Sequence, residues 1–243
     1  MRIIVCKNYE DMSRAAAKLV ASQITLKPDC VLGFATGSTP IGLYKELCAM
    51  YGRGEIDFSA VTSFNLDEYY PIRKSNPESY DYFMKDNLFS KVNIPSENIH
   101  IPDGETEVPE IECLNYEKVI ESCGGIDLQI LGIGVNGHIG FNEPDINLST
   151  KTHVTELSQS TIDANSRFFD SEDEVPRKAI TMGVSTILKS KKIVLLASGK
   201  NKHAVIKELL DEKVNTNVPA TLLNVHRDVT IICDEEAYYG DDI

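Results

Sequence analysis

Residues 131–144, LGIGVNGHIGFNEP, place a histidine, a glutamate and two asparagines among glycines at the end of an apolar run. The imidazole of His138 could carry a proton near neutral pH, and the carboxylate of Glu143 could fix its tautomer. Asn136 could hydrogen-bond a hydroxyl or orient the ring. A single loop histidine is more often structural than catalytic, but the flanking glycines and the acidic neighbour favour acid–base chemistry on a small polar substrate.

An acidic pair follows a second apolar run, in FNLDEYY. A carboxylate at the end of a strand often only caps the chain or pairs with a basic group. Apolar neighbours and two tyrosines, however, could raise its pKa toward values useful to a general base. We take Asp67 as the candidate base and Glu68 as a supporting group behind it.

The segment GFATGSTPIGLYKEL predicts a glycine-rich turn that leads into a helix beginning near Pro40. Ser38 and Thr39 are natural N-cap residues, and proline is typical of a first helical turn. The same turn could hold a phosphate through Gly37, the free helix N–H groups and both hydroxyls. Neither the Walker pattern nor the dinucleotide-binding glycine pattern is present, so a monophosphate ester fits better than a nucleotide.

An anionic substrate would need a local positive pocket, because the chain carries a net charge of −13. Arg167 lies among aromatic residues in NSRFF, and Lys202 follows an apolar run in SGKNKHAV. Lys200 is the alternative amine in the same segment. A solvated surface position is the default for either lysine, and only their place after a predicted strand favours a role in binding.

The same composition excludes several classes of function. The acidic balance disfavours binding to nucleic acid and to anionic membranes. There is no serine elbow, no second histidine at metal spacing and no CxxC pair among the six cysteines. The start MRIIVCKNYE reads as a strand and not as a signal peptide, and no apolar run approaches the about 20 residues of a membrane span. We therefore expect a cytoplasmic protein with reduced thiols and without a zinc site.

Short apolar runs alternate with longer amphipathic segments along the chain. The predicted strands are 2–6, 30–35, 60–66, 127–134, 178–184, 191–198 and 228–234. The predicted helices are 11–24, 40–54, 79–92, 110–124 and 201–213. This alternation predicts a single-domain, Rossmann-like α/β fold, with a mainly parallel sheet and helices on both faces.

Four of these strands, 30–35, 60–66, 127–134 and 191–198, run directly into the polar and glycine-rich segments described above. Ligands of open parallel sheets bind outside the carboxyl ends of the strands. We therefore expect the four segments to form one composite site.

With these segments in hand, the chain resembles the glucosamine-6-phosphate deaminases (isomerising), whose fold is shared with ribose-5-phosphate isomerases and 6-phosphogluconolactonases. The resemblance covers essentially the full length and rests on GFATGSTPIGLY, TSFNLDEYY, LGIGVNGHIGFNEP, NSRFF and the CDE near the C-terminus. It implies that residues 1–243 form one catalytic domain. It also implies a hydrolase of amino-sugar catabolism that converts glucosamine 6-phosphate and water to fructose 6-phosphate and ammonia, without a cofactor.

The resemblance also implies a role for each motif. His138, assisted by Glu143 and Asn136, would open the sugar ring, and Asp67 would move a proton from C2 to C1 through an enolamine. The residues implied to hold the phosphate are Ser38, Thr39, Arg167 and Lys202. Lys202 is preferred to Lys200 because GKNK matches the G-x-x-K pattern of the family.

The chain departs from the longer, hexameric members of the family at several positions. Those members carry aspartate at the position of Asn136, and a basic pair where this chain has His153 and Thr155 in KTHVTEL. The C-terminal tail is also short. We therefore expect a member of the shorter branch, without activation by an amino-sugar phosphate and monomeric, with a homo-oligomer as the alternative.

Two other functions compete with this interpretation. A sugar-phosphate isomerase or lactonase on the same fold would share the phosphate loop, although the pairing of GHIGFNEP with LDEYY favours deamination. A sugar-phosphate-sensing module would usually carry a DNA-binding helix-turn-helix, whereas this sequence opens on a predicted strand and keeps Asp67 and His138. Release of ammonia from glucosamine 6-phosphate separates deamination from both.

Overall fold

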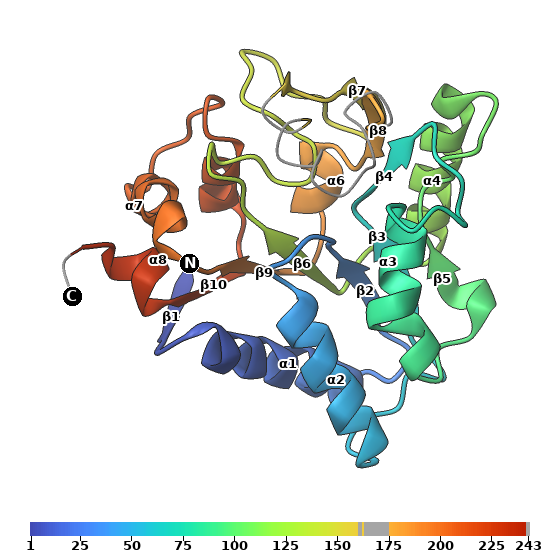
Figure 1. The fold of residues 1–243 in the computed structure, drawn as a ribbon, viewed down its shortest axis with the longest axis horizontal. Coiled ribbons are helices and arrows are strands. Elements are labelled where there is room, and N and C mark those ends of the chain that lie inside the picture. Colours follow the sequence, from blue (N-terminus) through green and yellow to red (C-terminus); the bar gives the residue numbers. More distant parts are fainter. Residues whose placement is uncertain (160–161, 163–174, 242–243) are drawn as a thin grey trace.

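The computed structural model describes residues 1–159, 162 and 175–241. Its main feature is a sheet of seven strands in which every neighbouring pair is parallel (Figure 1). In their order across the sheet, the strands are β1 (Arg2–Cys6), β10 (Val229–Asp234), β9 (Lys192–Ala197), β6 (Leu128–Gly132), β2 (Val31–Phe34), β3 (Thr62–Asn65) and β5 (Ile99–His100).

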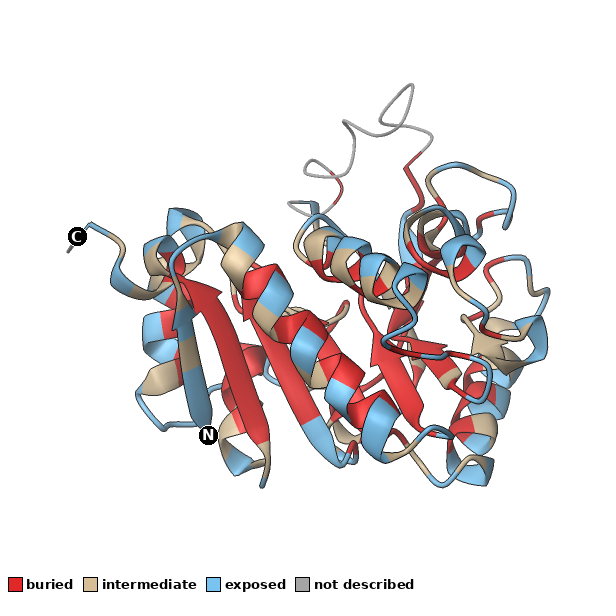
Figure 2. Ribbon diagram, turned by 90° about the horizontal axis from the view of Figure 1, so that it is seen from below, coloured by how far each residue is buried: buried red, intermediate tan, exposed pale blue. Residues whose placement is uncertain are grey.

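Helices cover both faces of this sheet, and each face has its own apolar core. The first core packs α1 (Tyr9–Leu26), α2 (Ile41–Gly52) and α3 (Tyr80–Asn87) against the strands. The second packs α4 (Pro109–Ser122), α6 (Val184–Leu188), α7 (His203–Leu210) and α8 (Glu235–Tyr239) against the opposite face. Figure 2 shows the inner strands buried between helices whose outer sides are exposed, whereas the edge strand β1 is largely exposed. The predicted α/β fold with helices on both faces is confirmed.

Within the described part of the chain, the other helical segments with defined bounds are 3-10 helices. They are η1 (Phe89–Lys91), η2 (Ser96–Asn98), η4 (Lys200–Lys202) and η5 (Pro219–Val225).

A second, antiparallel sheet was not foreseen from the sequence. It has the order β4-β8-β7, with β4 (Asp67–Tyr70), β8 (Lys178–Thr181) and β7 (His153–Glu156), and its strands group together at the top of Figure 1. Of the predicted strand 178–184, residues 178–181 form β8 of this second sheet, and Val184 begins helix α6. The residues DEYY, which read as the polar end of the preceding strand, form β4. β4 pairs with β8 more than a hundred residues later in the chain, and a local pattern does not encode such a pairing.

Asp127 ties together the starts of three strands at the amino edge of the main sheet. One carboxylate oxygen accepts from the Lys27 amine at 2.7 Å and from the Val31 N–H at 2.8 Å, and the other accepts from the Lys191 amine at 2.7 Å. Burial raises the pKa of Asp127, but the two amines and the N–H group lower it by more, so the pKa lies below its ordinary value. The edge opposite the predicted site is thus held by a buried charge.

We expect Asp127→Asn to lower the free energy of unfolding at pH 7 by about 1–3 kcal/mol, because an amide cannot accept all three hydrogen bonds. A carboxylate with a lowered folded-state pKa stabilises the fold above its unfolded-state pKa, and this contribution disappears as the pH falls through the folded-state value. Urea unfolding at pH 7 and pH 3 should therefore show a cost that shrinks on acidification. The exposed Asp29→Asn is the control, and an equal pH dependence in both variants would contradict the assignment.

Candidate active site

Four neighbouring strands carry the predicted site at one edge of the sheet. Their order is β9-β6-β2-β3, and all of them are parallel, so their carboxyl ends lie side by side. From β2 the chain adds β3 and β5 on one side, and from β6 it adds β9 and β10 on the other side. The order of the strands therefore reverses between β2 and β6. Such a switch point is where open α/β sheets bind their ligands.

The loop after β6 holds Asn136, His138 and Glu143 in one connected group. One carboxylate oxygen of Glu143 lies 3.3 Å from Nδ1 of His138, and the other accepts a hydrogen bond of 2.7 Å from the Asn136 amide. The backbone N–H of His138 donates to the Asn136 side-chain oxygen at 3.2 Å. The neutral asparagine thus fixes the carboxylate that faces the imidazole.

Two glycines allow this loop to fold onto the site. A Cβ at Gly134 would lie 2.4 Å from ring atoms of His138, so the ring occupies the space that any side chain there would need. Gly140 has a φ of +58°, and a Cβ there would lie 2.9 Å from the Thr181 hydroxyl and 3.4 Å from Oδ2 of Asp67. The backbone two residues after His138 therefore lies against Asp67.

Asp67 is the first residue of β4 and is only 5% exposed. Burial, together with the negative charge of Glu68, raises the pKa of Asp67 from an ordinary 3.8 to about 8. Its partner across the small sheet is Thr181, whose hydroxyl accepts the Phe141 N–H at 3.1 Å. No sequence signal had pointed to Thr181, which comes more than a hundred residues later.

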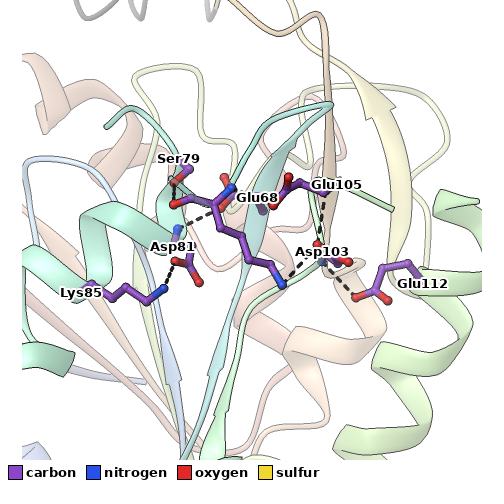
Figure 3. A network of polar contacts seen from close by, with 8 residues as sticks. Glu68, Ser79, Asp81, Lys85, Asp103, Glu105 and Glu112 are labelled. Atoms are coloured by element: carbon purple, nitrogen blue, oxygen red, sulfur yellow. Dashed lines mark hydrogen bonds and ion pairs between the residues drawn. The ribbon is translucent and has the colours of Figure 1, made fainter. Parts of the chain in front are cut away.

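Glu68 turns away from this site toward the start of α3. Its carboxylate accepts the N–H groups of Tyr69, Tyr80 and Asp81 at 2.9, 2.8 and 2.9 Å. Figure 3 shows Glu68 beside Asp81, which itself pairs with Lys85. Burial raises the pKa of Glu68 to about 7, and the three N–H donors counteract part of that rise. Glu68 thus lies behind Asp67, anchored on a helix N-terminus.

The glycine-rich turn after β2 departs from the predicted capping. Helix α2 begins at Ile41, and its N-cap residue, Pro40, makes no side-chain capping hydrogen bond. The prediction that Ser38 or Thr39 caps the helix is therefore wrong. The hydroxyl of Tyr9 in α1 takes that place, accepting the Gly42 N–H at 2.8 Å and donating to the Ser38 carbonyl at 3.1 Å.

The two candidate lysines point in different directions. The Lys202 amine is half-buried and donates a hydrogen bond of 2.7 Å to the carbonyl of Ile133, directly before the histidine loop. Burial lowers the pKa of Lys202. The Lys200 amine instead pairs with Asp241 near the C-terminus, and both of those side chains are largely exposed. Arg167 lies outside the described residues.

Two kinds of feature are absent from the described residues. Within these residues no group of three or more His, Cys, Asp or Glu side chains is arranged to hold a metal ion. None of the helices described is long and apolar enough to cross a membrane.

The comparison with known families agrees with this geometry. Residues 7–232 match the model of the family described as glucosamine-6-phosphate isomerases/6-phosphogluconolactonase. The chain belongs to this family.

Relatives within the family cover almost the whole chain. A glucosamine-6-phosphate deaminase of Thermoanaerobacter sp. (strain X514) is 61% identical over 98% of this chain and 94% of the relative. A glucosamine-6-phosphate deaminase of Halothermothrix orenii is 60% identical, over 98% of both chains.

Solved structures of the family separate into two degrees of likeness. A monomeric glucosamine-6-phosphate deaminase of the NagB superfamily superposes with a TM-score of 0.95 at 43% identity, over 98% of both chains. A 6-phosphogluconolactonase from Leishmania guyanensis reaches a TM-score of 0.75 at 22% identity, over 99% of this chain and 98% of that one. The second likeness shows the shared fold alone.

We expect Asp67→Asn to raise the melting temperature at pH 8.5 while changing it little at pH 4. A carboxyl whose pKa is higher in the folded than in the unfolded chain destabilises the fold increasingly as the pH rises from about 4 to about 8, and an amide removes that cost. Thermal unfolding at the two pH values measures the effect. Asp86→Asn, on the exposed side of α3, is the control, and a lower melting temperature at pH 8.5 would contradict a raised pKa.

Proposed function

We propose that this protein is a glucosamine-6-phosphate deaminase, which converts glucosamine 6-phosphate and water to fructose 6-phosphate and ammonia. The observation that carries the proposal is the approach of Gly140 to Asp67, which places the candidate base and the loop of His138 around the same space. Relatives that are 60–61% identical and carry the name of this activity support it.

The first chemical step is opening of the sugar ring by His138. The imidazole accepts the proton of the O1 hydroxyl and returns a proton to the ring oxygen O5, so that the C1–O5 bond breaks and an open-chain aldehyde results. Glu143, 3.3 Å from Nδ1, stabilises the imidazolium that forms between the two transfers. Asn136 keeps the second oxygen of Glu143 in place through its 2.7 Å hydrogen bond.

The second step is proton transfer by Asp67. The carboxylate removes the proton from C2 to give an enolamine and then delivers it to C1, which leaves an iminium ion at C2. Water adds at C2 and ammonia departs, giving the ketose. A pKa raised to about 8 makes the ionised carboxylate a stronger base than an ordinary aspartate.

The phosphate is held away from the reacting carbons. Its binding groups are Gly37, Ser38, Thr39, Arg167 and Lys202. The hydroxyls of Ser38 and Thr39 do not cap α2 in the described structure, and the Lys202 amine extends over the end of β6. Binding energy from this remote group orients the sugar for both proton transfers.

We further infer that residues 1–243 act as one catalytic domain in the cytoplasm, as a monomer, and without an allosteric amino-sugar phosphate. The monomeric relative at a TM-score of 0.95 supports the oligomeric state. In β7, burial lowers the pKa of His153, so this side chain adds no fixed positive charge where the longer members carry basic residues. The reaction uses only positioned acids and bases and needs no cofactor.

We expect the wild-type protein to release ammonia from glucosamine 6-phosphate, and Asp67→Asn to lower kcat by about 10²–10⁴-fold because no base remains at C2. In this variant, exchange of the C2 proton with solvent deuterium should vanish from the NMR spectrum, while competitive binding of a phosphosugar stays near the wild-type value. Continued exchange would assign the base to another residue. Hydrolysis of 6-phosphogluconolactone without ammonia release would favour the lactonase alternative.

We expect His138→Gln to slow turnover of the cyclic substrate by about 10²-fold or more, because ring opening loses its proton carrier. A neutral amide of similar length keeps the loop but does not shuttle protons. Open-chain substrate, generated transiently and followed by stopped-flow, should react in the variant at a rate closer to that of the wild type. Equal loss on both forms of the substrate would remove His138 from the ring-opening step.

A further inference from the structure

Asp234, the last residue of β10, is a buried carboxylate that the mechanism above does not use. It is 4% exposed, and within the described part of the chain no lysine, arginine or histidine forms an ion pair with it. Its partners are instead N–H and O–H donors from two different segments. A buried carboxylate with such partners fixes the geometry of those donors.

Capping of α8 explains only one of these contacts. Oδ1 accepts the Ala237 N–H at 2.8 Å, which is the usual contact of an N-cap aspartate. The Gly199 N–H lies 3.1 Å from both carboxylate oxygens, and the Ser198 hydroxyl donates to Oδ2. Most of the hydrogen bonds that the Asp234 carboxylate accepts therefore come from the turn that follows β9.

That turn determines where the Lys202 amine lies. Gly199 has a φ of +89°, a conformation that favours glycine, and its carbonyl accepts the Lys202 N–H at 3.0 Å. The Lys202 side chain then reaches back to donate to the Ile133 carbonyl at 2.7 Å. A continuous series of hydrogen bonds thus runs from β10, through the end of β9, to the end of β6.

We propose that Asp234 is a positioning residue for the substrate's phosphate group, acting through the Ser198–Gly199 turn on the Lys202 amine. This inference rests on the proposed function only in taking Lys202 as the phosphate-binding amine. Asp234 itself does not touch the substrate. The amine keeps two hydrogens beyond the one given to Ile133, and the fixed turn holds them in place before the anion arrives.

The test is Asp234→Asn, with calorimetric titration of inorganic phosphate and steady-state kinetics on glucosamine 6-phosphate. Asparagine still caps a helix, but its NH₂ group cannot accept the Gly199 N–H, and the Ser198 hydroxyl would have to turn from donor to acceptor. We expect phosphate affinity to fall about tenfold and KM to rise by a similar factor, with kcat within about twofold, because the lost interaction is remote from the reacting carbons. The double variant Asp234→Asn/Lys202→Ala should bind phosphate no more weakly than Lys202→Ala alone, because both substitutions act on the contact between the Lys202 amine and the phosphate.

Three variants separate this role from a purely structural one. Asp127→Asn also weakens a buried carboxylate but at the opposite edge of the sheet, and it should leave phosphate affinity unchanged. Lys200→Ala should also leave it unchanged, because that amine faces Asp241. Ser198→Ala keeps the α8 cap intact and should lower phosphate affinity by a smaller factor than Asp234→Asn, and it decides the question if Asp234→Asn does not fold.

The outcomes are distinct. A lowered melting temperature with unchanged phosphate affinity in Asp234→Asn, or unchanged affinity in Ser198→Ala, would overturn the positioning role, as would a wild-type protein that does not bind phosphate. If the wild type binds phosphate but releases no ammonia, the proposed function fails, and the phosphate titrations still decide the role of Asp234.

Discussion

The parallel alignment of β9, β6, β2 and β3 is the constraint on which the rest of this structure depends. Because the four strands run in one direction, the segment that follows each of them starts at the same edge of the sheet. No single segment contains the whole site, and each of the four supplies a part of it. Asp127 fixes the amino edge of three of these strands, and Asp234 connects the carboxyl ends of β10 and β9.

Burial at this edge of the sheet disfavours the charged forms of Asp67 and Lys202. Burial raises the pKa of Asp67 and lowers that of Lys202, so the fold gives up stability to keep a carboxyl and an amine partly out of water. A base with a raised pKa accepts a carbon-bound proton more readily, and a partly desolvated amine interacts more strongly with a phosphate. In a chain of net charge −13, such local arrangements decide where an anion binds.

The fold by itself does not choose between the activities found in this family. A lactonase with 22% identity shares the architecture at a TM-score of 0.75, so the sheet alone is compatible with both chemistries. Relatives that are 60–61% identical and are named glucosamine-6-phosphate deaminase favour deamination. In this chain, β4 pairs with β8 and holds Asp67 beside Gly140. A base in contact with the histidine loop is what proton transfer between adjacent carbons of one sugar requires.

The sequence by itself determined six strands of the main sheet (β1, β2, β3, β6, β9 and β10), the helices α1, α2, α3, α4 and α7, and the local group of Asn136, His138 and Glu143, because periodicity and short spacings are local properties. It did not predict the short strand β5 or the helices α6 and α8. Only the tertiary structure decided the order of the strands, the pairing of β4 with β8 and the different directions of Lys200 and Lys202. It also replaced the expected capping of α2 by a contact from Tyr9. These features depend on partners distant in the chain, and which distant segments meet is settled by packing over the whole molecule and not by any one stretch of residues.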